Sequence, residues 1–221
     1  MKRIPLDQRM LPDYCKGEEI MNMVTHIVGG GIGVIGLVLC LLRAWADPVA
    51  LISAGIYGVS MITLYAMSSI YHGLRPSMGK KVLQVLDHCT IYFLIAGTYT
   101  PILVCAFIPA YPVIGWTLLA VEWGLSALAC TLTAIDLKRW NVFSMVCYIV
   151  TGWAILPFTP QAMTLLGTTG FAFLLAGGIS YTIGAVLYGI GSKVHWIHSV
   201  FHIFVVLGTL LQLISILFFV L

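Results

Sequence analysis

Long apolar runs follow one another along the chain, separated by short breaks that contain proline, glycine or charged residues. An α-helix needs about twenty apolar residues to cross the hydrocarbon core of a bilayer, whereas barrel strands alternate over about ten residues. Asp47-Pro48 has the sequence of a helix N-cap followed by proline at the first helical position. The pattern predicts seven membrane-spanning helices, at residues 20–42, 49–72, 82–106, 113–133, 141–158, 164–190 and 195–219.

Composition supports a membrane protein. The chain is 60% hydrophobic and 9% charged, whereas soluble domains are about 45–50% apolar and about 25% charged. No break between the predicted spans is long enough for a soluble domain. We therefore expect an all-α integral membrane protein with a cytoplasmic segment at residues 1–19 and one seven-helix membrane domain at residues 20–221.

The basic residues predict the orientation. With an odd number of spans the two termini lie on opposite sides, and cytoplasmic loops carry the excess of Lys and Arg. Only Arg43 falls on the side of the membrane opposite to the N-terminus. Ten basic residues fall on the N-terminal side: Lys2, Arg3, Arg9, Lys16, Arg75, Lys80, Lys81, Lys138, Arg139 and Lys193. We predict a cytoplasmic N-terminus and an extracytoplasmic C-terminus, with the basic loops touching anionic lipid headgroups rather than nucleic acid.

A glycine motif in the first span has a simpler explanation than cofactor binding. Residues 31–36 match G-x-G-x-x-G, but no strand precedes them and no acidic residue follows at about twenty positions, as a dinucleotide site requires. We expect Gly29 and Gly33 to let a neighbouring helix approach closely.

Ionisable residues within the spans are few and lie mostly at one depth. Such residues are functional candidates by default, because burying them in lipid is costly. In the predicted topology all but Glu122 lie near the cytoplasmic face: His26, His72, Asp87, His88, His198 and His202, with His195 at the edge. We expect His195 at the interface, His26 in a hydrogen bond to a neighbouring helix, and Glu122 neutral or hydrogen-bonded. Asp87 and His88 differ in direction by about 100° and need not face one cavity.

Three of these histidines have the spacing of metal ligands. His198 and His202 are four residues apart and share one helix face, as do Ser68 and His72. Two histidines at i and i+4 can bind one metal ion. His72 at the same depth would complete three histidine ligands and leave a fourth position open, as in catalytic zinc sites. Asp87 can orient a ligand or a bound water from the next shell.

The motifs resemble those of a known family. Ser68-x-x-x-His72 closes the second span, Asp87 lies early in the third, and His198-x-x-x-His202 opens the seventh. This arrangement is similar to the PAQR family of progestin and adiponectin receptors, and most similar to its bacterial hemolysin III branch. Segments that carry the bacterial similarity are residues 17–20 with 25–26, and residues 87–92 with 96–101. The wider superfamily includes alkaline ceramidases, which hydrolyse a lipid amide.

The resemblance implies a zinc ion held by His72, His198 and His202, with Asp87 contacting a zinc-bound water and Ser68 beside it. It also implies a multi-pass protein of the bacterial inner membrane. Adiponectin recognition does not carry over, because the extended receptor-type N-terminal domain is missing, and the sequence shows no amphipathic insertion segment that would support lysis.

The polar residues within the spans and the family resemblance together lead to three candidate functions. The first is a zinc-dependent hydrolase of a lipid amide or ester, acting near the cytoplasmic face and contributing to membrane homeostasis, with Asp87 as general base and Pro101 kinking the third span. The second is a non-enzymatic sensor or receptor-like protein in which zinc is structural. The third, ion or proton transport, is weaker, because only Glu122 lies deeper in the membrane.

Overall fold

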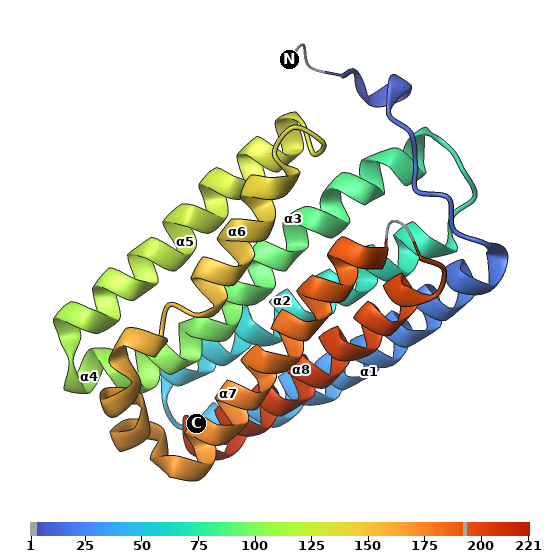
Figure 1. The fold of residues 1–221 in the computed structure, drawn as a ribbon. Coiled ribbons are helices and arrows are strands. Elements are labelled where there is room, and N and C mark those ends of the chain that lie inside the picture. The colour runs from blue at the N-terminus through green and yellow to red at the C-terminus, as the bar shows by residue number, and fades with distance from the viewer. Residues whose placement is uncertain (1–3, 192–193) are drawn as a thin grey trace.

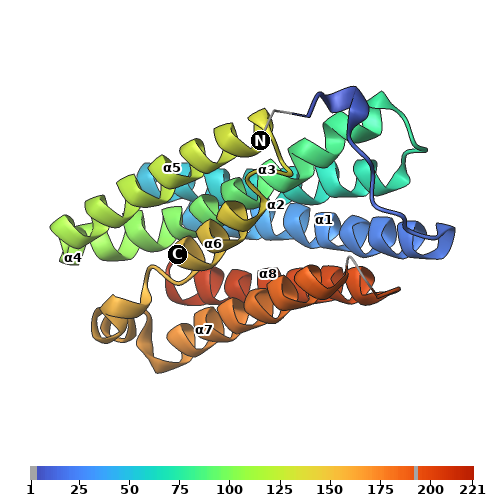
Figure 2. The same ribbon diagram turned by 45° about the horizontal axis from the view of Figure 1, so that its top comes forward.

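The computed structural model describes residues 4–191 and 194–221, and every regular element within them is a helix. Lys2, Arg3 and the predicted loop residues Ser192 and Lys193 lie outside the described residues. The α-helices are α1 Lys16–Ala44, α2 Pro48–Gly73, α3 Met78–Pro101, α4 Ile108–Ala110, α5 Pro112–Ile135, α6 Asn141–Gly152, α7 Thr159–Gly191 and α8 Ile197–Phe219. The long helices run side by side along one direction (Figure 1), and α7 and α8 form a layer next to α1 (Figure 2).

Six helical stretches in the described part of the chain are long and apolar enough to cross a membrane. They are Lys16–Ala44, Pro48–Gly73, Met78–Ala110, Pro112–Ile135, Asn141–Gly191 and Ile197–Phe219. The predicted fifth and sixth spans fall within the single stretch Asn141–Gly191. The protein is therefore an all-helical, multi-pass membrane protein.

Capping residues fix the starts of α1 and α2. The Asp47 carboxylate accepts hydrogen bonds from the backbone N–H groups of Val49 (2.8 Å) and Ala50 (3.3 Å), as the Asp-Pro pair predicts. At α1 the Glu18 carboxylate accepts the backbone N–H of Cys15 at 2.8 Å, which completes a capping box. The first helix therefore starts at Lys16, within the segment predicted to precede the membrane domain.

Helix α6 ends earlier than predicted. It stops at Gly152 and is followed by a 3₁₀ turn at Leu156–Phe158, whereas the sequence predicts a helix to residue 158. The Tyr99 hydroxyl of α3 donates to the Gly152 carbonyl (3.1 Å) and accepts the Ile155 N–H (3.2 Å). Pro157 also disfavours helical backbone in the residue before it. A side chain from another helix thus satisfies the backbone groups that this helix end leaves free.

Pro101 changes the helix type rather than ending the helix. A π-helix at Ile102–Phe107 follows it directly and continues into α4. Proline has no N–H and removes one i→i−4 hydrogen bond, which a local π-helical turn accommodates.

Glycines provide close helix contacts, as expected from the G-x-G-x-x-G segment. A Cβ atom on Gly29 would overlap the ring of Tyr65 on α2, and one on Gly36 would lie 2.8 Å from the Leu213 side chain on α8. Gly31, in contrast, has open space around it. The glycines of α1 therefore serve helix packing.

The N-terminal strap, defined here as residues 4–15, crosses the end of the bundle where α1 starts (Figure 1). Its first described residue, Ile4, donates its N–H to the Asp136 carboxylate after α5 (3.4 Å). Burial raises the pKa of Asp136, but the N–H groups of Arg139 and Ile4 and the charge of Arg9 lower this pKa by more. The pKa of the Asp136 carboxyl is therefore below its ordinary value of 3.8. The strap is thus tied to the α5–α6 turn.

Candidate metal centre

The side chains of His72, His198 and His202 lie close together at the end of the bundle where α1 starts. All three are buried, and one ring nitrogen from each lies within 4.8 Å of the others. The Nε2 atoms of His198 and His202 are 3.1 Å apart, one helical turn from each other on α8. His72 joins them from the last turn of α2. The three-histidine group predicted from spacing and depth is therefore present.

The Nε2 atom of His72 has no hydrogen-bond partner among the described residues and is available to bind a metal ion. The Nδ1 atom of His72 donates to the Glu19 carboxylate at 2.7 Å, and Nε2 is buried. Glu19 is held in turn by the buried Lys80 ammonium at 2.5 Å. Metal-binding histidines commonly donate their second ring nitrogen to a carboxylate in this way.

Two further contacts from α1 support α8. The buried Asn22 side chain accepts a hydrogen bond from Ser199, the residue after His198, at 2.6 Å. Glu18 accepts the backbone N–H of Trp196 at 2.6 Å, where the chain enters α8. Trp196 has φ 67°, a left-handed conformation that costs a non-glycine residue about 1–2 kcal/mol. Glu18 therefore stabilises a strained turn two residues before a candidate ligand.

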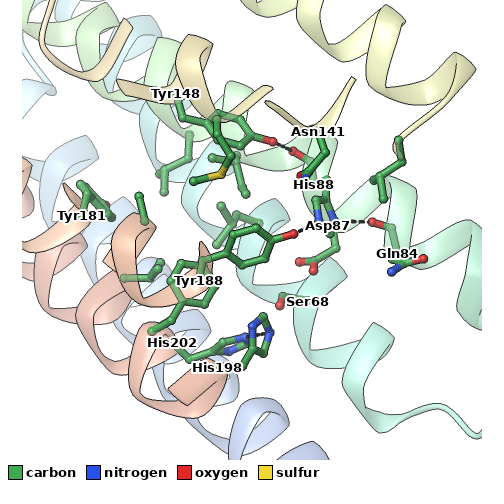
Figure 3. Close-up of a pocket in the computed structure, with 18 of the residues that line it drawn as sticks. Ser68, Gln84, Asp87, His88, Asn141, Tyr148, Tyr181, Tyr188, His198 and His202 are labelled. Atoms are coloured by element: carbon green, nitrogen blue, oxygen red, sulfur yellow. Dashed lines mark hydrogen bonds between the residues drawn. The ribbon is translucent and has the colours of Figure 1, made fainter. Parts of the chain in front are cut away.

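A cavity of about 440 Å³ adjoins the histidines and carries the predicted catalytic residues. Its wall includes Ser68, Asp87, His198 and His202, and is mostly apolar elsewhere. Figure 3 shows the Asp87 carboxylate facing into this space, with Ser68 adjacent on the side of the histidines. The cavity thus brings an acid, a hydroxyl and the candidate ligands to one place.

His88 also lines the cavity, together with Asp87, although the two differ in helical phase. Its Nδ1 donates to the Gln84 carbonyl (2.8 Å), so its Nε2 accepts from the Tyr188 hydroxyl of α7 (2.9 Å). The His88 carbonyl accepts from the Tyr148 hydroxyl of α6 (2.8 Å). His88 therefore links three helices across the cavity and is not part of the metal-binding group (Figure 3).

The remaining ionisable residues behave differently from one another. The His195 side chain is 76% exposed, as expected for an interfacial residue. His26 stacks on His202 with ring centroids 3.8 Å apart, and neither of its nitrogens has a hydrogen-bond partner in the described part, so the expected interhelical hydrogen bond is absent. Glu122 is fully buried, and its two oxygens have no partner among the described residues.

The histidine nitrogens fit a metal ion. Two nitrogens that each lie about 2.0–2.1 Å from a tetrahedral ion are separated by roughly 3.4 Å, close to the observed 3.1 Å between His198 and His202. The unpartnered Nε2 of His72 gives the same indication, because buried polar atoms normally have partners. Imidazole ligands suit zinc and several other transition metals.

Several residues of this centre were missed by sequence reasoning. Glu19, Asn22 and Lys80 support the ligands, and Tyr14 of the strap stacks on His198 with ring centroids 4.7 Å apart. One signal was available, because Asn22 and His26 are polar and four residues apart at the start of an apolar helix. The contacts of Tyr14 and Lys80 have no such local signal.

Fold and site together define a class: a multi-pass helical membrane protein with a buried three-histidine group at one end of its bundle. The profile of the haemolysin-III-related family matches residues 15–213. The chain therefore belongs to the haemolysin III family, as the motifs indicated.

Curated relatives cover most of the chain. Hemolysin-3 of Bacillus cereus is 35% identical over 206 residues, 92% of each protein. The hemolysin-3 homolog of Bacillus subtilis (strain 168) is 33% identical over 204 residues, 91% of this chain and 94% of the relative. The human monocyte to macrophage differentiation factor is 26% identical over 213 residues, 92% of this chain and 84% of the relative. These similarities agree with a multi-pass protein of a bacterial cell membrane.

Proposed function

We propose that this protein is a zinc-dependent hydrolase that cleaves an amide or ester bond of a membrane lipid near the cytoplasmic face, and so contributes to membrane homeostasis. The observation that carries the proposal is the three-histidine group beside an apolar cavity, whose wall contains His198 and His202 of that group together with Asp87 and Ser68. A cavity of about 440 Å³ is in the size range of small-molecule sites, about 300–1,000 Å³.

The proposed topology has seven spans with the N-terminus inside. Helix α6 starts at the strap end, where Asn141 and Arg9 line one cavity, and α7 returns to that end, where Gly191 lies against His198. The two helices run in opposite directions, which supports separate spans. The described basic residues Lys16, Arg75, Lys80, Lys81, Lys138 and Arg139 lie at the strap end, and Arg43 lies at the other.

His72, His198 and His202 would hold the ion, which when bound would lower the pKa of a water and polarise the substrate carbonyl. Asp87 would take a proton from the attacking water and deliver it to the leaving nitrogen or oxygen as the C–N or C–O bond breaks. Ser68 would hydrogen-bond Asp87 and hold its carboxylate in position. The apolar wall would take up an acyl chain and exclude bulk water from the reaction.

The first test is metal content and turnover of the purified protein. We expect one equivalent of zinc in the wild type, none in His198→Ala, and hydrolysis of some member of a panel of lipid amides and esters. Asp87→Asn should keep the zinc and lose hydrolysis, and Glu122→Gln, a buried carboxyl outside the cavity lining, should keep both. Absence of zinc in the wild type, or zinc without turnover on the whole panel, would refute the enzyme proposal.

A second candidate is a non-enzymatic sensor in which the ion is structural. The observation that favours it is the bracing around the histidines, since Glu19 and Asn22 of α1 contact residues of both α2 and α8. In that case Asp87→Asn should leave the cellular phenotype intact, whereas His202→Ala should lower the melting temperature. The hydrolase predicts loss of phenotype in Asp87→Asn with unchanged melting.

A further inference from the structure

Arg9 of the N-terminal strap is a buried cation with unused hydrogen-bonding capacity. Its side chain is fixed by two backbone carbonyls, of Ile4 (Nε, 3.2 Å) and Ile135 (Nη2, 3.1 Å). Only 8% of the residue is exposed, and Nη1 has no partner among residues 4–191 and 194–221. A buried guanidinium nitrogen without a hydrogen-bond acceptor is unfavourable. A ligand that supplies an acceptor to Nη1 would remove this cost.

Arg9 lies in the wall of the same cavity as the histidines, where that cavity reaches the surface. The exposed side chains of Gln8, Lys138 and Asn141 line this end, so the opening carries a second cation and two amides. From here the lining continues past Asp87 to buried apolar residues of the bundle, such as Leu94 and Val205. One molecule with a polar head and a long apolar tail would match both parts.

The acidic groups nearby do not occupy the guanidinium. The charge of Arg9 lowers the pKa of Asp136, but the Asp136 oxygens accept from the N–H groups of Ile4 and Arg139, and Asp136 forms no ion pair with Arg9 within 4 Å. Lys138 is likewise without a carboxylate partner in the described chain. The opening therefore offers two cations to an incoming anion.

We propose that Arg9 and Lys138 bind the phosphate of an anionic phospholipid whose acyl chain enters the cavity. Guanidinium groups suit phosphate oxygens because they donate several N–H groups in a fixed planar arrangement. Anionic phospholipids are concentrated at the cytoplasmic surface of membranes, next to the predicted position of the strap. The inference rests on the proposed function only in that both place a lipid in this cavity, and it adds the charge class of that lipid.

Binding of intact lipids to the purified full-length protein tests the proposal. Native mass spectrometry in a neutral detergent would give affinities for dioleoyl phosphatidylglycerol and for dioleoylglycerol, which has the same acyl chains and no phosphate. We expect Arg9→Gln to weaken binding of phosphatidylglycerol about tenfold, the loss expected for a hydrogen bond to a charged group, and to change binding of dioleoylglycerol less than about twofold. Lys138→Gln, at an exposed position, should cause a smaller selective loss, about two- to fivefold.

Arg43→Gln is the matched control, because Arg43 lies at the opposite end of α1; it should leave both affinities unchanged. An equal loss for both lipids in Arg9→Gln would assign Arg9 a purely structural role in the strap and overturn the proposal, as would no loss at all in either variant. Binding of inorganic phosphate to the wild type without preference between the lipids would assign the site to free phosphate and overturn the lipid assignment. The bound mass identifies uncleaved lipid, so a failure to detect hydrolysis would refute the proposed function and leave this result unaffected.

Discussion

Glu19→Gln tests whether the carboxylate behind His72 prepares that histidine for a metal ion. In the native protein the carboxylate accepts Nδ1–H at 2.7 Å and leaves Nε2 free to bind. A neutral amide holds the ring more weakly and permits the other tautomer. Loss of such a supporting partner typically lowers metal affinity about 10–100-fold, or about 1.4–2.8 kcal/mol. We expect a loss in this range.

Zinc affinity would be measured by competition with a chromophoric chelator, after the metal is removed and titrated back. The substitution also leaves the buried Lys80 ammonium without its carboxylate partner, which lowers stability on its own. The double variant Glu19→Gln/Lys80→Met removes this unpaired cation; it should recover melting temperature but not zinc affinity. Glu122→Gln should retain native affinity. An affinity within about twofold of the wild type in Glu19→Gln would refute the supporting role of the carboxylate.

Three further predictions concern the fold. Gly29→Ala should destabilise the protein by about 1–3 kcal/mol through overlap with a ring of α2, seen as a lower melting temperature, whereas Gly31→Ala, in open space, should not. Tyr99→Phe should cost about 1–3 kcal/mol, because the Gly152 carbonyl at the end of α6 and the Ile155 N–H after it lose their partner; unchanged melting would contradict this. Because the pKa of Asp136 lies below 3.8, its contribution to holding the strap should be complete above that pH and lost as the pH falls through the lower native value, and a spin label at position 8 should then become mobile. Asp136→Asn should abolish that pH dependence.

The histidine pair shows how far local sequence reasoning reaches. Helical periodicity alone places His198 and His202 on one face, and hydropathy places them at the depth of His72. These inferences hold in the structure because the periodicity and the length of a membrane helix are set by its own backbone and by the bilayer. For the same reason the sequence predicts an all-helical protein and the close-packing role of Gly29.

Tertiary structure decided which side chains support and surround that group. Glu19 meets His72 across 53 positions of sequence, and Glu18 meets Trp196 across 178, so no local pattern reveals either contact. Where α6 ends depends on the Tyr99 hydroxyl of another helix. Only the folded chain brings the strap over the cavity and buries Arg9 there. The sequence by itself determined the helices and the candidate ligands, because those follow from periodicity and burial in lipid. Packing between distant helices determined which residues support the ligands, because hydrogen bonds form only between atoms that packing brings within reach.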